Sequence, residues 1–244
     1  MLTRLDHLVI LVSDLEGAVR DYEGLGFGVT PGGEHADGLT RNALVPFRDG
    51  TYLELVAFVD PDDPKDNVWG WRDFSPEEGL IDYCAASDAL YEDVERFRNL
   101  GLEVDGPHDG GRRLPHGGEI LWRSASFRQR GRVLPFLIED LTPRDRRVPG
   151  GPAASHPNGA TGIARLEVSI PGSNGVSENL AALTGTDPER PHLGACQLVL
   201  VEGNREGPSA VHLSTARPAG ARQLDRTLAR GVRLTLAPDT QARR

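Results

Sequence analysis

Cysteine, methionine and aromatic residues are scarce in this chain of 244 residues. Only two cysteines are present, Cys84 and Cys196, and each stands in its own apolar stretch far from the other. They form no C-x-x-C pair, which argues against a zinc knuckle or a redox site. We therefore expect two buried thiols that pack as small hydrophobic side chains.

Long apolar runs and an excess of positive charge are also missing. No stretch approaches the roughly 20 apolar residues that a membrane-spanning helix requires. The 36 acidic side chains outnumber the 27 basic ones, which gives a formal charge of -9. Such a balance repels nucleic-acid phosphates and anionic lipids, so neither nucleic acid nor membrane is an expected partner. A secretory signal is not visible at the N-terminus, and we expect a cytoplasmic protein.

The sequence does contain an order of elements that occurs twice. Residues 5–12 form an apolar run typical of a buried strand, and a helical pattern and three short strands are expected by residue 60. The same order of strand, helix and three strands recurs over residues 79–141, in step when Ser13-Asp14 is aligned with Ser87-Asp88. A repeat of this length predicts two βαβββ modules, at 1–60 and 79–141, that together form a unit over 1–141.

Glycine and proline place the expected turns within these modules. In the first module we expect a strand at 26–30 followed by a turn at 31–35. In the second module, the glycine-rich stretch 107–118 is expected to be a loop.

The remainder of the chain is less regular. Residues 142–161 are rich in proline, glycine and arginine, which predicts a linker across the surface. Residues 162–244 carry shorter strand and helix signals, with helices expected at 177–183 and 219–230. We interpret this last section as one or more degenerate modules of the same type.

Several short motifs, in a fixed order, resemble those of a known family. They are Leu5-Asp6-His7-Leu8-Val9, Gly32-Gly33-Glu34-His35, Thr40-Arg41-Asn42-Ala43, Thr51-Tyr52-Leu53-Glu54-Leu55, Ile120-Leu121-Trp122-Arg123 and Leu134-Pro135-Phe136-Leu137-Ile138-Glu139. The chain thereby resembles the glyoxalase-like domain family of the vicinal-oxygen-chelate superfamily, which includes glyoxalases, bleomycin resistance proteins and extradiol dioxygenases. The resemblance covers roughly residues 3–170.

The resemblance implies an α+β fold in which repeated βαβββ modules form curved, cup-shaped mixed sheets flanked by helices. It also implies a small-molecule ligand inside the cup. Modules of this superfamily pair within one chain or between two chains, so we expect a monomer or a homodimer.

A metal site follows from the resemblance as well. Metal-dependent members take one ligand from the first strand and one from the last strand of each module. Those places hold His7 and Glu54 in the first module and Glu139 in the second, but no histidine stands near 81–83. The implied ligands are therefore His7, Glu54 and Glu139, and nitrogen and oxygen donors of this kind suit Zn²⁺, Mn²⁺, Ni²⁺ or Fe²⁺.

Other polar residues are candidates for catalysis or for substrate binding. Glu54, Glu139 and His35 are candidates for proton transfer. Arg41, Asn42, Trp122, Arg123 and His156 are candidates for substrate binding. Two arginines facing one cup would favour an anionic ligand, since a guanidinium binds carboxylate or phosphate through two parallel hydrogen bonds.

Each candidate also has an ordinary structural explanation. His7 could be a core histidine that is satisfied by a backbone carbonyl, and the arginines could form surface salt bridges. The alternation of side chains along a strand places Tyr52, Glu54 and Val56 on one face. Trp69 and Trp71, between the modules, could cover the pocket or simply anchor the packing.

Three hypotheses of function remain open at this stage. The first is a metal-assisted lyase or isomerase that acts on a small oxygenated, anionic substrate; a dioxygenase is disfavoured because the second histidine is missing from its usual place. The second is a metal-free protein that binds or sequesters a small molecule. The third is a structural subunit with a vestigial pocket.

Overall fold

The apolar run near the N-terminus forms the strand around which the barrel closes. The computed structural model describes residues 2–114, 117–127, 132–172, 175–217 and 221–238. Strand β1 (Leu2–Leu11) has Leu8 and Ile10 in a large core outside the barrel, and Val9 and Leu11 in a smaller core inside it. The run lacks polar alternation because both of its faces are buried.

The two predicted modules are present. The first contains β1, α1 (Leu15–Gly24), β2 (Thr30–His35), β3 (Thr40–Pro46) and β4 (Tyr52–Phe58). The second contains β5 (Gly79–Ser87), α2 (Leu90–Asn99), β6 (Val104–Arg113), β7 (Glu119–Phe127) and β8 (Phe136–Asp140). In each module the last strand pairs in parallel with the first, and the two first strands, β1 and β5, pair antiparallel. The α+β fold of repeated βαβββ modules is therefore confirmed.

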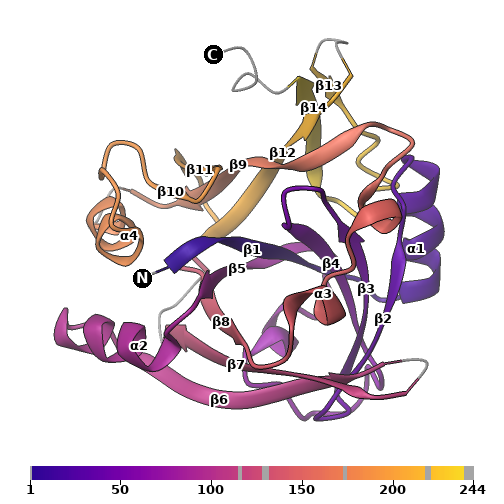
Figure 1. The fold of residues 1–244 in the computed structure, drawn as a ribbon. Helices are drawn as coiled ribbons and strands as arrows, with labels where there is room; N and C mark the ends of the chain where they lie inside the picture. Colours follow the sequence, from indigo (N-terminus) through magenta and orange to yellow (C-terminus); the bar gives the residue numbers. More distant parts are fainter. Residues whose placement is uncertain (1, 115–116, 128–131, 173–174, 218–220, 239–244) are drawn as a thin grey trace.

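The curved sheets close into a barrel rather than remaining an open cup (Figure 1). The strand order around the barrel is β1-β4-β3-β2-β6-β7-β8-β5. The two modules meet at two seams in the barrel. The first is the pairing of β1 with β5, and the second, between β2 and β6, consists of the pairs Glu34↔Arg113 and His35↔Arg112. Helix α1 packs on β3 and β4, and α2 packs on β6, β7 and β8.

The glycines of the first module were misleading as turn signals. Residues 30–35 form β2, although a turn was expected at 31–35 and a strand at 26–30. A Cβ atom on Gly32 would lie 1.9 Å from Oδ1 of Asn42. Gly32 is therefore needed for the close approach of β2 to a neighbouring side chain, not for a change of direction.

In the second module, too, a glycine-rich stretch that was expected to be a loop forms a strand. Strand β6 covers Val104–Arg113, within the expected loop 107–118. A Cβ atom on Gly110 would lie 2.6 Å from Nε1 of Trp122, so the glycine leaves room for the indole inside the barrel.

A second sheet of six strands lies across β1 and β5 (Figure 1). It is built from β9 (Ala160–Ile170), β10 (His192–Leu193), β11 (Cys196–Glu202), β12 (Gly207–Thr215), β13 (Arg222–Gln223) and β14 (Arg233–Pro238), with helix α4 at Val176–Thr184. Leu166 and Val211 of this sheet share one hydrophobic core with Leu8 and Tyr83 of the barrel.

The pairing within this sheet resembles that of the barrel. Strands β9 and β12 pair antiparallel, while β11 runs parallel to β9 and β14 runs parallel to β12. We propose that residues 162–244 form a reduced pair of modules. The helix expected at 177–183 is confirmed as α4, but the one expected at 219–230 is wrong for its described part, 221–230. There, Arg222 pairs with β14 and the Asp225 carboxylate accepts the Thr227 N–H at 2.8 Å, which favours a turn.

The segment between the barrel and the second sheet is more than a connection. It contains α3 (Arg144–Arg147) and two buried side chains, Arg147 and His156, that contact the barrel. Both cysteines are buried and free, as expected. Among the described residues, no helix is long and apolar enough to span a membrane.

Candidate functional site

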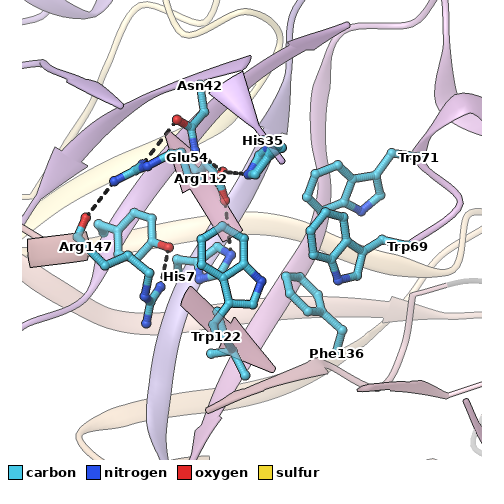
Figure 2. A pocket seen from close by; sticks show the side chains of 12 residues that line it. His7, His35, Asn42, Glu54, Trp69, Trp71, Arg112, Trp122, Phe136 and Arg147 are labelled. Carbon is cyan, nitrogen blue, oxygen red and sulfur yellow. Dashed lines mark hydrogen bonds and ion pairs between the residues drawn. The ribbon is translucent and has the colours of Figure 1, made fainter. Parts of the chain in front are cut away.

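A cavity of about 20 Å³ lies inside the barrel, large enough for a single water molecule. Twelve residues line it: His7, His35, Asn42, Tyr52, Glu54, Trp69, Trp71, Arg112, Trp122, Phe136, Ile138 and Arg147. Figure 2 shows the polar side chains on one side and Trp69, Trp71 and Phe136 on the other. The cavity therefore joins a charged wall to an aromatic wall.

His7 reaches the cavity from β1 with both ring nitrogens engaged. Nδ1 lies 2.8 Å from Oδ1 of Asp6, and Nε2 lies 3.1 Å from Oε2 of Glu54. A β-bulge at Leu5/His7 sets two residues of β1 against one of β5, so the side chains of Asp6 and His7 meet although they are adjacent in the strand. The ring also stacks on Tyr52, with 4.6 Å between centroids.

Glu54 is a buried carboxylate with several donors. Asn42 donates to its Oε1, and Nε2 of His35 lies 3.6 Å from the same oxygen. Burial alone would raise the pKa of Glu54, but the hydrogen bond and charge of His7 outweigh it and lower this pKa to about 2. Glu54 is therefore ionised.

The two histidines beside Glu54 have pKa values shifted in opposite directions. Burial would lower the pKa of His7, but hydrogen bonds to Asp6 and Glu54 outweigh it, and the pKa is raised. Burial lowers the pKa of His35, and the charge of Glu54 offsets this only in part. Environments that separate two pKa values in this way favour a protonated His7 and a neutral His35.

Asp6 is held in place by arginines from α3. Arg147 donates through Nη1 to Oδ1 at 3.0 Å and through Nη2 to Oδ2 at 3.1 Å, and Arg144 also binds Oδ2. Arg147 is further bound by Asp140 of β8 and by the Tyr52 hydroxyl. Burial would raise the pKa of Asp6, but the charge of Arg147 and the hydrogen bond to His7 hold it well below its usual range.

Arg112 of β6 lines the same cavity and is 4% exposed. Its Nη1 donates to Oδ1 of Asn42 at 3.2 Å, and its Nη2 donates to the backbone carbonyl of Arg147 at 3.1 Å (Figure 2). Asn42 therefore links the guanidinium of Arg112 to the carboxylate of Glu54.

Trp69 and Trp71 form the aromatic wall. Their rings stack with 4.6 Å between centroids, and Nε1 of Trp71 donates to Oδ2 of the buried Asp82 at 3.0 Å. Arg132 donates to the backbone carbonyls of Trp69 and Gly70. Both tryptophans thus line the cavity and also pack in the inner hydrophobic core.

The structure brings together only part of the predicted site. His7, His35, Asn42, Glu54 and Trp122 line the cavity. Arg41 and Arg123 do not, because each is adjacent in its strand to a residue that points inward, Asn42 or Trp122, and neighbouring side chains alternate. Arg41 instead pairs with Glu16 of α1, and Arg123 lies 3.1 Å from Asp109 and 3.7 Å from Glu139.

Glu139 and His156 also lie away from the cavity. Phe136 and Ile138 of β8 are in its lining, so the alternation turns Glu139 to the outside, where it faces Arg123. His156 has a structural role, because it connects the segment after the barrel to the first module. Its Nδ1 accepts the Gly28 N–H at 2.9 Å and its Nε2 donates to the Pro46 carbonyl at 2.8 Å.

The strand register explains why the implied metal ligands do not assemble. His7 pairs with Cys84 across β1 and β5, and the parallel partners of these two residues are Tyr52 and Phe136. Two residues further along β4 and β8 stand Glu54 and Ile138. The second module therefore offers a thiol and an aliphatic side chain where the first offers His7 and Glu54.

One alternative group of ligand atoms exists among the described residues. Ligand atoms of Asp6, His7 and Cys84 all lie within 4.8 Å of one another. Both oxygens of Asp6 already accept from Arg147, and burial raises the pKa of the Cys84 thiol well above its usual range. Neither this group nor the implied set of His7, Glu54 and Glu139 fits a divalent metal, although members of the superfamily often bind one.

Three charged residues of the site escaped the sequence analysis: Asp6, Arg112 and Arg147. Tyr52 was correctly placed on the face of Glu54 by strand alternation. Arg112 escapes because the composition of 107–118 predicts a loop, whereas alternation along a strand at 104–113 indicates that Arg112 points inward with Gly110. Arg147 gave no signal, because it comes from a stretch with the composition of a linker.

Comparisons with known proteins agree with this architecture. A hypothetical protein from Staphylococcus aureus superposes with a TM-score of 0.79 at 15% identity, covering 98% of this chain and 100% of that one. A variant of methylmalonyl-CoA epimerase from Streptomyces coelicolor, in complex with 2-nitronate-propionyl-CoA, gives a TM-score of 0.43 at 21% identity and covers 58% of this chain and all (100%) of its own. The epimerase from Mycobacterium tuberculosis gives 0.43 at 22% identity, with 58% and 90% covered.

The similarity to the staphylococcal protein shows a shared fold, while the similarities to the epimerases are too low to carry an argument. No curated protein matches the chain. The model of the glyoxalase-like domain, in contrast, matches residues 5–184, which include the barrel from Leu5 onward, α4 and the cavity. The chain is therefore a member of the glyoxalase-like domain family, with the fold of the vicinal-oxygen-chelate superfamily.

Proposed function

We propose that this protein is an isomerase-type enzyme that moves a proton on a small oxygenated, anionic substrate. The observation that carries the proposal is the convergence of two imidazoles on one buried carboxylate. Nε2 of His7 lies 3.1 Å from Glu54, and Nε2 of His35 lies 3.6 Å from it, inside a cavity lined by tryptophans. An acid and a base within reach of one site are the minimum that proton transfer requires.

In this proposal His35 is the base and His7 is the acid. Nδ1 of His35 lies 2.7 Å from the Thr40 hydroxyl, and when it donates there, Nε2 carries a free lone pair. The proton leaves the substrate carbon for Nε2 of His35, the electron pair of the broken C–H bond forms a C=C bond, and the π pair of the neighbouring carbonyl moves to its oxygen. The His7 imidazolium, whose Nε2–H also faces Glu54, stabilises that oxygen by its charge and by a shared hydrogen bond. Return of a proton to the opposite face of the same carbon inverts it. Where that carbon carries a hydroxyl, return of the proton to the adjacent carbon, with the hydroxyl proton passing to the enolate oxygen, moves the carbonyl group.

Asp6 and Glu54 support these roles. Asp6 fixes the orientation of the His7 ring, so that Nε2 faces the cavity. Glu54 stabilises the charge of His7 and lies beside His35, where it stabilises the imidazolium that forms when His35 accepts the proton. A metal-assisted lyase or isomerase, the function that the resemblance first implied, is not carried further, because the residues present do not fit a divalent metal.

Solvent deuterium exchange tests the proposal. Short acids incubated in D₂O with the wild type should gain deuterium, as followed by proton NMR: 2-oxo acids at the carbon next to the oxo group, and 2-hydroxy acids at the hydroxyl-bearing carbon next to the carboxyl group. Replacing His35 by Gln should slow the exchange by roughly 10² to 10⁴, the usual contribution of a general base. The matched control is His192→Gln, since His192 is an exposed histidine of β10. Equal exchange in the two variants would contradict the proposal.

A metal-free binding protein is the second candidate. It is favoured by the incomplete set of metal ligands, because Cys84 and Ile138 stand where the second module would supply its ligands. Saturable binding of an acid without any deuterium exchange would select this candidate over the isomerase.

A further inference from the structure

Arg112 is a buried cation that forms no ion pair with any described residue. Its side chain is 4% exposed, and its two hydrogen bonds go to neutral acceptors, the Asn42 amide oxygen and the Arg147 carbonyl. Nε of Arg112 has no acceptor among the described residues. Arg147 provides the contrast, because it is equally buried but bound by the carboxylates of Asp6 and Asp140.

An unpaired guanidinium in a protein interior is costly. Guanidinium groups remain charged in proteins, and a buried charge is retained only where it is paired or has a function. Glu54 is the acidic group nearest in the network, but Asn42 stands between the two side chains as a hydrogen-bonded bridge. The charge of Arg112 is therefore available to a ligand in the cavity.

The other free polar atoms of the cavity are donors as well. Nε1 of Trp69 and Nε1 of Trp122 are buried and have no acceptor among the described residues, and both rings line the cavity with Arg112. Both oxygens of Glu54, in contrast, already face donors, Asn42 and His7. A ligand that satisfies this cavity must supply acceptor atoms and negative charge.

We infer that Arg112 binds the carboxylate of a short-chain organic acid. A carboxylate is planar and matches the fork of a guanidinium, and it offers about four lone-pair sites to the three free donors. The cavity of about 20 Å³ admits even a small acid only when its wall of Trp69, Trp71 and Phe136 moves. A compact ligand with a short apolar portion that packs on this wall is therefore favoured over a larger phosphorylated one. The inference rests on the proposed function only in using the same cavity, and it names the substrate class as a short carboxylic acid.

Intrinsic fluorescence reports on this cavity directly. The chain has three tryptophans, Trp69, Trp71 and Trp122, and all of them line the cavity. Acetate, glycolate and lactate, titrated at constant ionic strength against chloride, should change the emission of the wild type saturably. Inorganic phosphate should not. The same acids should raise the melting temperature, since a ligand that binds only the folded state stabilises it.

The matched variants isolate the guanidinium. In Arg112→Met, which keeps the length of the side chain, Kd for the acids should rise at least tenfold. Arg112→Lys keeps the charge without the fork and should give an intermediate Kd, and it serves as the test if the Met variant does not fold. Arg41→Met and Arg123→Met remove partly exposed arginines outside the cavity and should leave Kd unchanged.

The outcomes separate this inference from the proposed function. Saturable binding by the wild type that persists unchanged in both Arg112 variants would overturn the inference, and so would binding of phosphate alone or of no acid at all. Saturable binding lost in Arg112→Met, without deuterium exchange in the wild type, would support the inference and overturn the isomerase. Deuterium exchange that is equal in the wild type and in Arg112→Met would support the isomerase and overturn the inference about Arg112.

Discussion

Arg147 binds both carboxylate oxygens of Asp6 through its two terminal nitrogens, at 3.0 and 3.1 Å. This pair joins the segment after the barrel to the first strand of the barrel, and both side chains are buried. Asp6 in turn holds His7. The orientation of His7, the proposed catalytic acid, thus depends on Arg147, which lies 140 positions further along the chain.

Removing Arg147 should destabilise the protein. Arg147→Met leaves the carboxylates of Asp6 and Asp140 short of a partner in the interior, and we expect a loss of about 3 kcal/mol in the free energy of unfolding, measured with urea. Arg41→Met breaks an exposed pair with Glu16, and it should cost less than about 1 kcal/mol. Equal losses in the two variants would show that the buried network contributes no more than a surface pair.

Asp6 should raise the pKa of His7. In Asp6→Asn the hydrogen-bond acceptor remains but the charge is lost, so we expect the pKa of His7 to fall, as measured by NMR titration of its ring protons. A histidine with a raised folded-state pKa stabilises the protein below its unfolded pKa, near 6.5, and loses this contribution as pH rises through the folded value. Besides a loss at every pH from the weakened pair with Arg147, the variant should therefore show an additional loss of stability on the acidic side of neutrality. An unchanged pKa would mean that Glu54 alone sets the charge of His7.

His156 should make the fold sensitive to acid. Burial lowers its pKa, only partly offset by the hydrogen bond to Pro46, so the unfolded chain takes up the proton more readily. Stability from this residue is complete above the unfolded pKa of about 6.5 and declines as pH falls below it, by up to about 1.4 kcal/mol per pH unit. Urea unfolding at pH 7.5 and 5.5 should show a smaller decline in His156→Gln than in the wild type. A decline of the same size in both would assign the acid sensitivity to other groups.

Metal content should be independent of His7. Elemental analysis of the wild type and of His7→Ala, each after exposure to Zn²⁺, Mn²⁺, Ni²⁺ and Fe²⁺, should give the same low ratio of metal to protein, because Cys84 and Ile138 occupy the second-module places. Near-stoichiometric metal in the wild type that is lost in His7→Ala would instead restore a chelate site and a metal-assisted mechanism.

Much of the fold could be predicted from the sequence because its signals are local. Apolar runs, helix periodicity and the repeat of one order of elements fixed both modules of the barrel. The errors at 31–35 and 107–118 came from glycines that make room for neighbouring side chains, Asn42 and Trp122, and such contacts cannot be recognised before the partner strand is known.

The site was predictable only where alternation along a strand decides the direction of a side chain. His7 and Glu54 were identified by their places in the module, and Tyr52 by its spacing from Glu54. Arg41 and Asn42 could not both face inward, and the choice of the arginine ignored this rule. Arg112 and Arg147 become visible only in three dimensions, through a strand seam and through a segment that folds back onto the barrel.

The narrow seam between β2 and β6 has a consequence for how the site is divided. One of its two residue pairs is His35↔Arg112, so the proposed base belongs to the first module and the proposed anion binder to the second, directly opposite each other. Neither half of the barrel carries both functions. The site is therefore complete only when the barrel is closed at this seam. Opening the seam would separate Arg112, which is proposed to hold the substrate, from His35, which is proposed to react with it.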